Sequence, residues 1–274
     1  MTRFLAFTLA LVPSPVCSTL VVFIPTKAGI VVAAETRQTA PSSVYCDGGK
    51  PKVIISARSR LAVGAITGTD KWYNFPGIPR DKVCEFIAHA APVFDLAPVV
   101  ETFLGEHTTS ITLDHIEDLR GRCIRAFQAF FSGHPEVAAQ TNSGELSQVL
   151  IATFDRKTLA SSVWSFKVLV DNSSPTGGEV VAVTWGTVDK GDWYIAGESE
   201  YFDRHVKFGA ASQVRCKPTV SETDEPYGRW IAINLIQAAS RTAEKIPPPH
   251  GIGGPIDVTF VDGRSKISLE RVER

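Results

Sequence analysis

The sequence predicts an α+β domain in which helices pack outside two β-sheets, an α/β/β/α sandwich. Apolar runs rich in β-branched residues occur in separate blocks, and stretches with helical spacing lie between them. The predicted order is strands, helices, strands, helix, strands, and segregated blocks of this kind are typical of layered α+β folds. A chain of 274 residues is long enough for one domain with a substantial core. Its composition, 44% hydrophobic and 21% charged, is that of a folded globular protein.

Residues 1–18 have the pattern of a secretory signal peptide or leader. Arg3 is followed by a short apolar run, then by prolines and small residues. Val16 and Ser18, at three and one residues before a cut between 18 and 19, suit an A-x-A-like site. We therefore expect an exported protein, secreted or periplasmic, whose folded domain is 19–274. The alternative is a buried first strand behind an uncleaved leader.

The domain begins with two pairs of predicted strands. The runs 20–24 and 30–34 are apolar without alternation, which suits strands buried on both faces, and a glycine-containing turn joins them. After the polar connection 38–49, the runs 52–55 and 61–66 resemble a second pair. We expect the two pairs to form one antiparallel unit.

Helical signals dominate the next part of the chain. Turn and capping residues at 67–70 lead into a predicted helical start at 71–75, and 81–90 resumes the helical pattern between prolines. The strongest helix begins at Thr112 or Asp114. Its apolar positions recur every three or four residues, which is the spacing of one buried stripe: Ile116, Leu119, Cys123, Ile124, Phe127 and Phe131.

Strand signals then return, and one more helix precedes a closing hairpin. The predicted strands are 149–154, 162–170, 180–185 and 193–196. The helix 227–246 follows Pro226 and stops at three prolines. Its expected buried side consists of Trp230, Ile233, Leu235, Ile236, Ala239 and Ala243. The closing hairpin joins 256–261 to 265–269 through an Asp-Gly turn.

Charge and motif content exclude several functions. A formal charge of -1 and a pI near 6.6 give no basic footprint for nucleic acid. No apolar run reaches the roughly 18 to 20 residues of a membrane span. The histidines, among them His115 and His134, are scattered without metal-ligand spacing, so we expect neither a metal nor a cofactor.

Four cysteines remain once the leader is removed, and their state is open from sequence. They show no CxxC spacing. In an exported chain they could form two disulfides in any of three connectivities, and buried free thiols are an equal alternative. The four are Cys46, Cys84, Cys123 and Cys216.

Three motifs at the start of the domain carry a resemblance to a known family. Thr19 begins the first strand, Lys27-Ala28-Gly29 forms the turn, and Glu35-Thr36-Arg37 ends the second strand. This arrangement resembles the start of a mature proteasome β-subunit, a member of the N-terminal-nucleophile (Ntn) hydrolases, with the family's spacing and no gap. Glu35 stands where that family usually has aspartate.

Two further positions extend the resemblance. Lys52 begins a strand much as the family's active-site lysine does, one residue further from Thr19 than expected. Gly68, after Gly64-Ala65-Ile66-Thr67, corresponds to the oxyanion-hole glycine. Near the C-terminus, Gly253-Gly254 resembles the glycine pair that follows the last long helix. The similarity covers 19–72 well, 227–263 moderately and the middle of the chain only by element order.

The resemblance implies a fold and a mechanism. The fold would be a four-layer α/β/β/α sandwich of antiparallel sheets, and its subunits commonly assemble into homo-oligomers. Thr19 would be the nucleophile, with its own α-amine as the base. Lys52 and Glu35 would activate it, and the Gly68 amide would stabilise the oxyanion. The implied substrate is a peptide or another amide.

Departures from the family's pattern keep other functions open. The family's supporting aspartate and serine would fall near Pro249 and Ile252, and neither side chain forms hydrogen bonds. The glycine-serine-glycine segment is echoed only by Ala196-Gly197-Glu198-Ser199. An inactive scaffold or ligand-binding protein of the same fold is therefore one alternative, and a disulfide-bearing binding protein of unrelated α+β fold is another. Cys17 would replace Thr19 as nucleophile if the cut fell two residues earlier.

Overall fold

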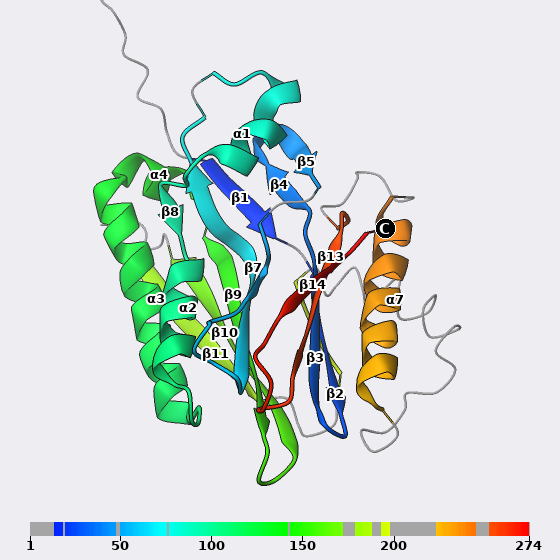
Figure 1. Cartoon of the computed structure of the whole chain (residues 1–274). Helices are drawn as coiled ribbons and strands as arrows, with labels where there is room; N and C mark the ends of the chain where they lie inside the picture. Colours follow the sequence, from blue (N-terminus) through cyan, green and yellow to red (C-terminus); the bar gives the residue numbers. More distant parts are fainter. Residues whose placement is uncertain are drawn as a thin grey trace, which may run out of the picture.

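The chain forms two antiparallel β-sheets with helices packed against them (Figure 1). The structure, a computed structural model, describes residues 14–18, 20–47, 50–75, 77–141, 143–171, 179–187, 193–197, 223–244 and 252–273. It establishes the mixed α/β class with antiparallel sheets. The finer assignment to a four-layer Ntn-type sandwich stays a prediction.

The larger sheet has nine strands within the described residues. They are β1 (Ser14–Ser18), β4 (Gln38–Ala40), β5 (Val44–Cys46), β6 (Val53–Ile54), β7 (Ala62–Tyr73), β8 (Phe94–Asp95), β9 (Gly144–Asp155), β10 (Ala160–Asp171) and β11 (Glu179–Thr187). The order is β11-β10-β9-β7-β1-β4-β5, and β6 and β8 also pair with β7. The strands predicted at 149–154, 162–170 and 180–185 are thus confirmed, each with longer bounds.

The smaller sheet has five strands in the described part of the chain. They are β2 (Leu20–Thr26), β3 (Gly29–Glu35), β12 (Tyr194–Gly197), β13 (Ile256–Val261) and β14 (Leu269–Val272), in the order β12-β2-β3-β13-β14. The first predicted hairpin is confirmed as β2 and β3, with Val22 opposite Ala33. The closing hairpin is confirmed as β13 and β14, although its second strand begins later than predicted.

The helices pack on the two sheets from different sides. They are α1 (Val83–His89), α2 (Ala97–Glu106), α3 (Leu113–Gly133), α4 (Pro135–Gln140) and α7 (Glu225–Ala243), with short 3-10 turns η1 (Pro41–Ser43) and η2 (Arg80–Lys82). Helices α2 and α3 contact strands of the larger sheet, and α7 contacts β2, β3 and β13 of the smaller one. None of the helices in the described residues is both long and apolar enough to cross a membrane.

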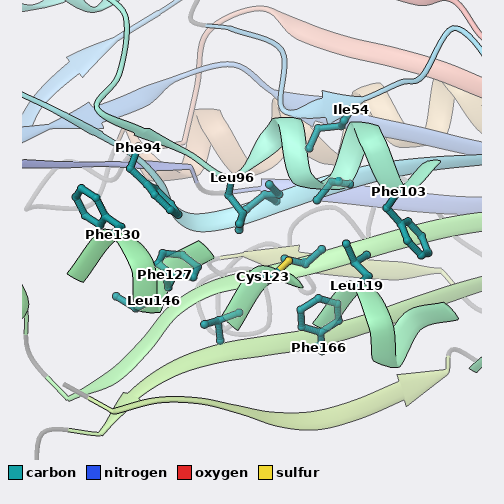
Figure 2. Close-up of a cluster of buried hydrophobic side chains, with 14 of the residues drawn as sticks. Ile54, Phe94, Leu96, Phe103, Leu119, Cys123, Phe127, Phe130, Leu146 and Phe166 are labelled. Atoms are coloured by element: carbon teal, nitrogen blue, oxygen red, sulfur yellow. The ribbon is translucent and has the colours of Figure 1, made fainter. Parts of the chain in front are cut away.

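Helix α3 confirms the strongest sequence prediction. The Thr112 side chain accepts a hydrogen bond from the backbone of His115 and caps the helix. The predicted stripe is buried apart from Ile124, which is partly buried. Figure 2 shows three residues of this stripe, Leu119, Cys123 and Phe127, in one cluster with side chains of α2 and the larger sheet, including Phe94, Phe103 and Phe166.

Helix α7 is also confirmed, but one of its buried positions is wrong. Trp230 is 48% exposed and stacks on the half-exposed Tyr227, and Ile233 is only partly buried. The face toward the sheet is already filled by Ile231, Ala232, Leu235, Ile236 and Ala239. Trp230 lies one position before that stripe, about 100° around the helix, so its hydrophobicity alone misled the prediction.

The prediction of a helical start at 71–75 is wrong, because β7 continues as a strand to Tyr73. Gly68 has a φ of +80°, which bends the strand without ending it. Beyond Gly68 the strand pairs with β1 on one edge and β8 on the other. Trp72 and Tyr73 then enter different apolar clusters, as alternating strand residues do.

The second predicted strand pair exists but belongs to the other sheet. Val53 of β6 lies opposite Ala65 of β7, as expected, yet both strands are in the larger sheet, whereas β2 and β3 form the smaller one. The polar connection 38–49 also contains β4 and β5. The expected single antiparallel unit is therefore two units whose facing side chains form a shared apolar cluster, including Val21, Val32, Val63 and Leu150.

The cysteines follow neither of the two simple alternatives. Cys46 and Cys84 form a disulfide that joins β5 to α1. Cys123 is a free thiol buried in α3. Cys216 lies outside the described residues.

Candidate active site

The chain passes from the larger sheet to the smaller one between Ser18 and Leu20. Thr19 itself is outside the described residues, but both of its neighbours are described. Ser18 ends β1 opposite Gly68 of β7 in the larger sheet. Leu20 begins β2 opposite Gly197 of β12 in the smaller sheet. The two sheets thus converge at the residue on which the predicted chemistry depends.

Glu35 is a fully buried carboxylate at the end of β3, and it contacts the first residue of β2 at this junction. One oxygen, Oε1, accepts hydrogen bonds from the Leu20 amide at 3.3 Å and from Lys52 Nζ at 2.6 Å. The other, Oε2, accepts from the amides of Arg37 at 2.7 Å and Gly253 at 3.3 Å. Four donors satisfy the carboxylate, so its charge is tolerated although it is buried.

Lys52 reaches Glu35 from the segment just before β6. The residue is 4% exposed, and its ammonium also donates to the Arg37 carbonyl. A buried ion pair of this kind holds both charges in fixed positions. The structure therefore brings together two of the predicted site residues, Glu35 and Lys52, beside the amide that follows Thr19.

Gly68 lies across from Ser18 and must be glycine for two reasons. Its positive φ is costly for any residue with a side chain, and a Cβ there would approach the Leu146 carbonyl oxygen to 2.4 Å. The next carbonyl, that of Thr69, accepts a hydrogen bond from the buried Ser147 hydroxyl. The backbone around the candidate oxyanion glycine is thus held from the β9 side.

Arg37 is a site residue whose role sequence reasoning missed. Its guanidinium binds Asp47 through two bonds of 2.6 and 3.1 Å and donates to the Ile252 carbonyl at 3.1 Å. The hydrogen bond to Asp47 raises the pKa of Arg37 above its usual value. Arg37 therefore ties the end of β3 to the loop that carries Gly253. Its place in the Glu35-Thr36-Arg37 motif was the available signal.

The departures seen in the sequence have a structural counterpart at Ile252. Its side chain is 1% exposed and packs in the apolar cluster below α7, so only its carbonyl faces Arg37 and Ser240. Pro249 lies outside the described residues. Gly197 ends β12 with a φ of +103°, whereas Glu198 and Ser199 are outside the described residues.

The two histidines considered from the sequence have local structural partners. His115 accepts a hydrogen bond from the Thr112 amide in the cap of α3. His134 lies 3.2 Å from Glu136 at the junction of α3 and α4. Within the described residues there is no group of three or more His, Cys, Asp or Glu side chains that could hold a metal ion.

Solved structures resemble this fold over nearly its whole length. Anbu (ancestral beta-subunit) from Yersinia bercovieri aligns with a TM-score of 0.51 at 14% identity, covering 93% of this chain and 88% of that one. The helical assembly of the Anbu complex from Pseudomonas aeruginosa aligns with a TM-score of 0.52 at 14% identity, covering 93% and 87%. No protein-family model matches the chain, and no curated protein matches it significantly.

These matches correct the family suggested by the sequence motifs. The two structures aligned here are Anbu proteins, which are proteasome-like but distinct, so the identification with proteasome β-subunits of the Ntn hydrolases is wrong. The motifs at Thr19, Lys27 and Glu35 describe one hairpin, and a hairpin is too little of the chain to separate related groups. At 14% identity the likeness shows that the fold resembles Anbu, and it does not establish an activity.

Proposed function

We propose that the chain is an exported, Anbu-like threonine hydrolase that cleaves a peptide or amide bond. The observation that carries this proposal is the path of the leader strand β1. It runs between β7 and β4 as an extended peptide and ends with Ser18 opposite Gly68. The bond between residues 18 and 19 therefore begins beside the glycine expected to bind an oxyanion, which is the relation that a substrate carbonyl would need.

The proposed mechanism uses the terminus created when that bond is cut. The Thr19 hydroxyl oxygen attacks the substrate carbonyl carbon, and the free α-amine of Thr19 takes the hydroxyl proton. The carbonyl oxygen becomes negative and is held by the Gly68 amide. The carbon–nitrogen bond then breaks, the leaving amine takes a proton from the Thr19 ammonium, and water hydrolyses the resulting ester.

Lys52 and Glu35 would support this chemistry in different ways. A buried ammonium near Thr19 lowers the proton affinity of the α-amine by charge repulsion and favours a negative hydroxyl oxygen. Glu35 holds Lys52 in place at 2.6 Å. Because Glu35 also accepts a hydrogen bond from the Leu20 amide, it fixes the first residue of β2, which is the residue that follows Thr19 in the chain.

Export is supported by the leader pattern and by the disulfide. Cys46 and Cys84 form a bond that persists in oxidising compartments and is uncommon in the reducing cytosol of mesophiles. We propose that residues 1–18 are removed and that 19–274 is the working domain, secreted or periplasmic. The packing of α2 and α3 on the larger sheet and α7 on the smaller one favours the four-layer α/β/β/α arrangement. A homo-oligomer is also proposed, because the Pseudomonas aeruginosa Anbu complex forms a helical assembly.

The second candidate is an inactive scaffold of the same fold, and Ile252 favours it. A buried apolar side chain stands near the place where the expected supporting hydroxyl would lie. A protein of unrelated fold, the third candidate from the sequence, is not supported, because the Anbu-like fold covers 93% of the chain.

The deciding experiment is N-terminal sequencing of the exported protein, followed by labelling with a threonine-directed electrophile such as a peptide epoxyketone. The hydrolase predicts a terminus at Thr19, labelling of that residue, and loss of labelling in Thr19→Ala with the fold intact. Thr102→Ala, at an exposed position of α2, is the matched control and should leave labelling unchanged. A processed but unreactive Thr19 would support the scaffold, and a retained leader would refute the hydrolase.

A further inference from the structure

A buried ionic cluster lines the leader strand, away from the proposed catalytic residues. Lys71 forms an ion pair with Asp70, and its Nζ lies 3.6 Å from Asp95. Asp70 and Lys71 are only 5% and 3% exposed. We call Asp70, Lys71 and Asp95 the ionic cluster; its formal charge is -1, from one ammonium and two carboxylates.

The strand register pairs this cluster with one position of the leader strand β1. Lys71 lies directly opposite residue 16 of β1 and directly opposite Asp95 of β8. Directly opposed residues of antiparallel strands present their side chains on the same face of the sheet. The third residue before the cut between 18 and 19 therefore shares a row with Lys71 and Asp95.

A β-bulge brings Asp70 into the same place. The pairing shifts from Lys71 opposite residue 16 to Thr69 opposite residue 17, which leaves Asp70 as the extra residue of β7. Bulges of this type redirect a side chain and are frequent beside active sites. Here the redirected carboxylate forms the ion pair with the ammonium of Lys71, and both residues are buried.

Tyr73 gives an independent sign that a ligand group belongs here. The residue is fully buried, and its hydroxyl has no hydrogen-bond partner among the described residues. Burial raises the pKa of Tyr73, and the charges of Lys71, Asp70 and Asp95 also act on it. Tyr73 is two residues from Lys71, on the same strand face and within reach of a long side chain at the third position.

The charge balance decides which side chain would fit. The Lys71 ammonium is already engaged by two carboxylates, and an acidic side chain would add a third negative charge. Burial lowers the pKa of Lys71, but the two aspartates outweigh it and the pKa is raised, as a negative local potential requires. A donor-bearing cation would reduce the excess negative charge and could also bond the Tyr73 oxygen.

We propose that the ionic cluster selects substrates that carry a lysine or arginine three residues before the cleaved bond. This rests on the proposed function, because it takes β1 as a stand-in for the substrate. After removal of the leader, an extended peptide would occupy the same slot between β7 and β4, with its third residue opposite Lys71.

The leader itself allows a test that needs no catalysis. In the full chain, Val16→Lys, Val16→Gln and Val16→Glu place three side chains of similar length at this position, and hydrogen exchange of β1 and β7 amides reports how firmly the strand is held. We expect exchange to be slower with lysine than with glutamate by at least about tenfold, the scale of a partly buried charge interaction. Glutamine should fall between them.

Asp95→Asn removes one charge from the cluster and keeps an oxygen for the bond that Asp95 accepts from the Ala97 amide. It should reduce the lysine-to-glutamate ratio to about threefold or less, whereas Asp81→Asn, at an exposed residue of η2, should not change it. A ratio near one in the parent, or a preference for glutamate, would overturn the proposal.

Peptide cleavage by the processed chain separates this inference from the function on which it rests. Faster cleavage with lysine or arginine at the third position, lost in Asp95→Asn, supports both. Equal cleavage of lysine, glutamine and glutamate peptides refutes the selectivity and leaves the hydrolase standing. If no peptide is cleaved, the hydrolase fails, and the exchange ratio alone decides whether the slot prefers a basic residue.

Discussion

Removing the Lys52 ammonium tests the electrostatic centre of the candidate site. Lys52→Met keeps the length of the apolar stem and leaves Glu35 buried without its ion-pair partner. Breaking a buried pair from one side typically costs about 3 to 5 kcal/mol. We expect the lower end, about 3 kcal/mol, because Glu35 keeps three backbone donors, from Leu20, Arg37 and Gly253.

The opposite substitution should cost more. Glu35→Gln leaves the Lys52 ammonium buried with the Arg37 carbonyl as its remaining acceptor, and it turns an amide nitrogen toward groups that are themselves donors. The expected loss is about 5 kcal/mol, at the upper end of the range. The double variant, Lys52→Met with Glu35→Gln, removes both charges. Its loss of unfolding free energy should therefore be about 2 to 3 kcal/mol smaller than the sum of the two single losses.

Urea unfolding followed by circular dichroism, with linear extrapolation, measures these losses. Lys82→Met is the matched control, because Lys82 and Glu85 form an ion pair of 3.0 Å that is largely exposed. It should leave the urea midpoint unchanged. A loss below about 1 kcal/mol for Lys52→Met, or strictly additive losses in the double variant, would refute the view that Glu35 and Lys52 are one buried electrostatic unit.

Three further predictions concern the surroundings of the site. Gly68→Ala should destabilise the fold by about 3 kcal/mol and abolish electrophile labelling, whereas Gly77→Ala, also at positive φ but with nothing within 4 Å, should cost about 1 kcal/mol in the same urea assay. Breaking the Cys46–Cys84 disulfide, which closes a loop of 38 residues, should cost about 3 to 4 kcal/mol; equal stability of Cys84→Ser and the oxidised parent would contradict this. Burial raises the pKa of Cys123 to about 12, so its thiol should resist alkylation at pH 9 in the native state, and rapid native alkylation would show that the thiol is accessible. The stability due to this shift is present at neutral pH and should be lost as pH rises from about 9 to about 12.

The sequence was most informative where local pattern and tertiary role agree. The runs that became β2 and β3 are apolar on both faces, and the structure buries every residue of both strands. The stripe of α3 has one period along its whole length, so no distant contact was needed to predict it. The ion pair of Glu35 and Lys52 joins segments 17 residues apart, and only the family resemblance suggested it.

The sequence was least informative where a strand depends on a partner far along the chain. The segment from Gly68 to Tyr73 has turn and cap residues, and it remains a strand because β1 and β8 pair with its two edges. The ionic cluster has the same origin, since Asp95 meets Lys71 only through that pairing. Trp230 was predicted to be buried from its hydrophobicity alone, but it is exposed because neighbouring residues of α7 already fill the face toward the sheet.

The leader strand determines the order of events that the proposed function requires. An export peptidase and the slot between β7 and β4 both need residues 14–18 to be extended, so their conformation suits either route to a free Thr19. The two routes differ in whether cleavage comes before or after folding. A peptidase that acts before folding would leave the slot empty from the start, whereas a cut within the folded chain would require Gly68 and Lys52 to be in place first. Lys52→Met therefore discriminates: a terminus that still forms at Thr19 in this variant assigns the cut to the export machinery, and a retained leader assigns it to the site itself.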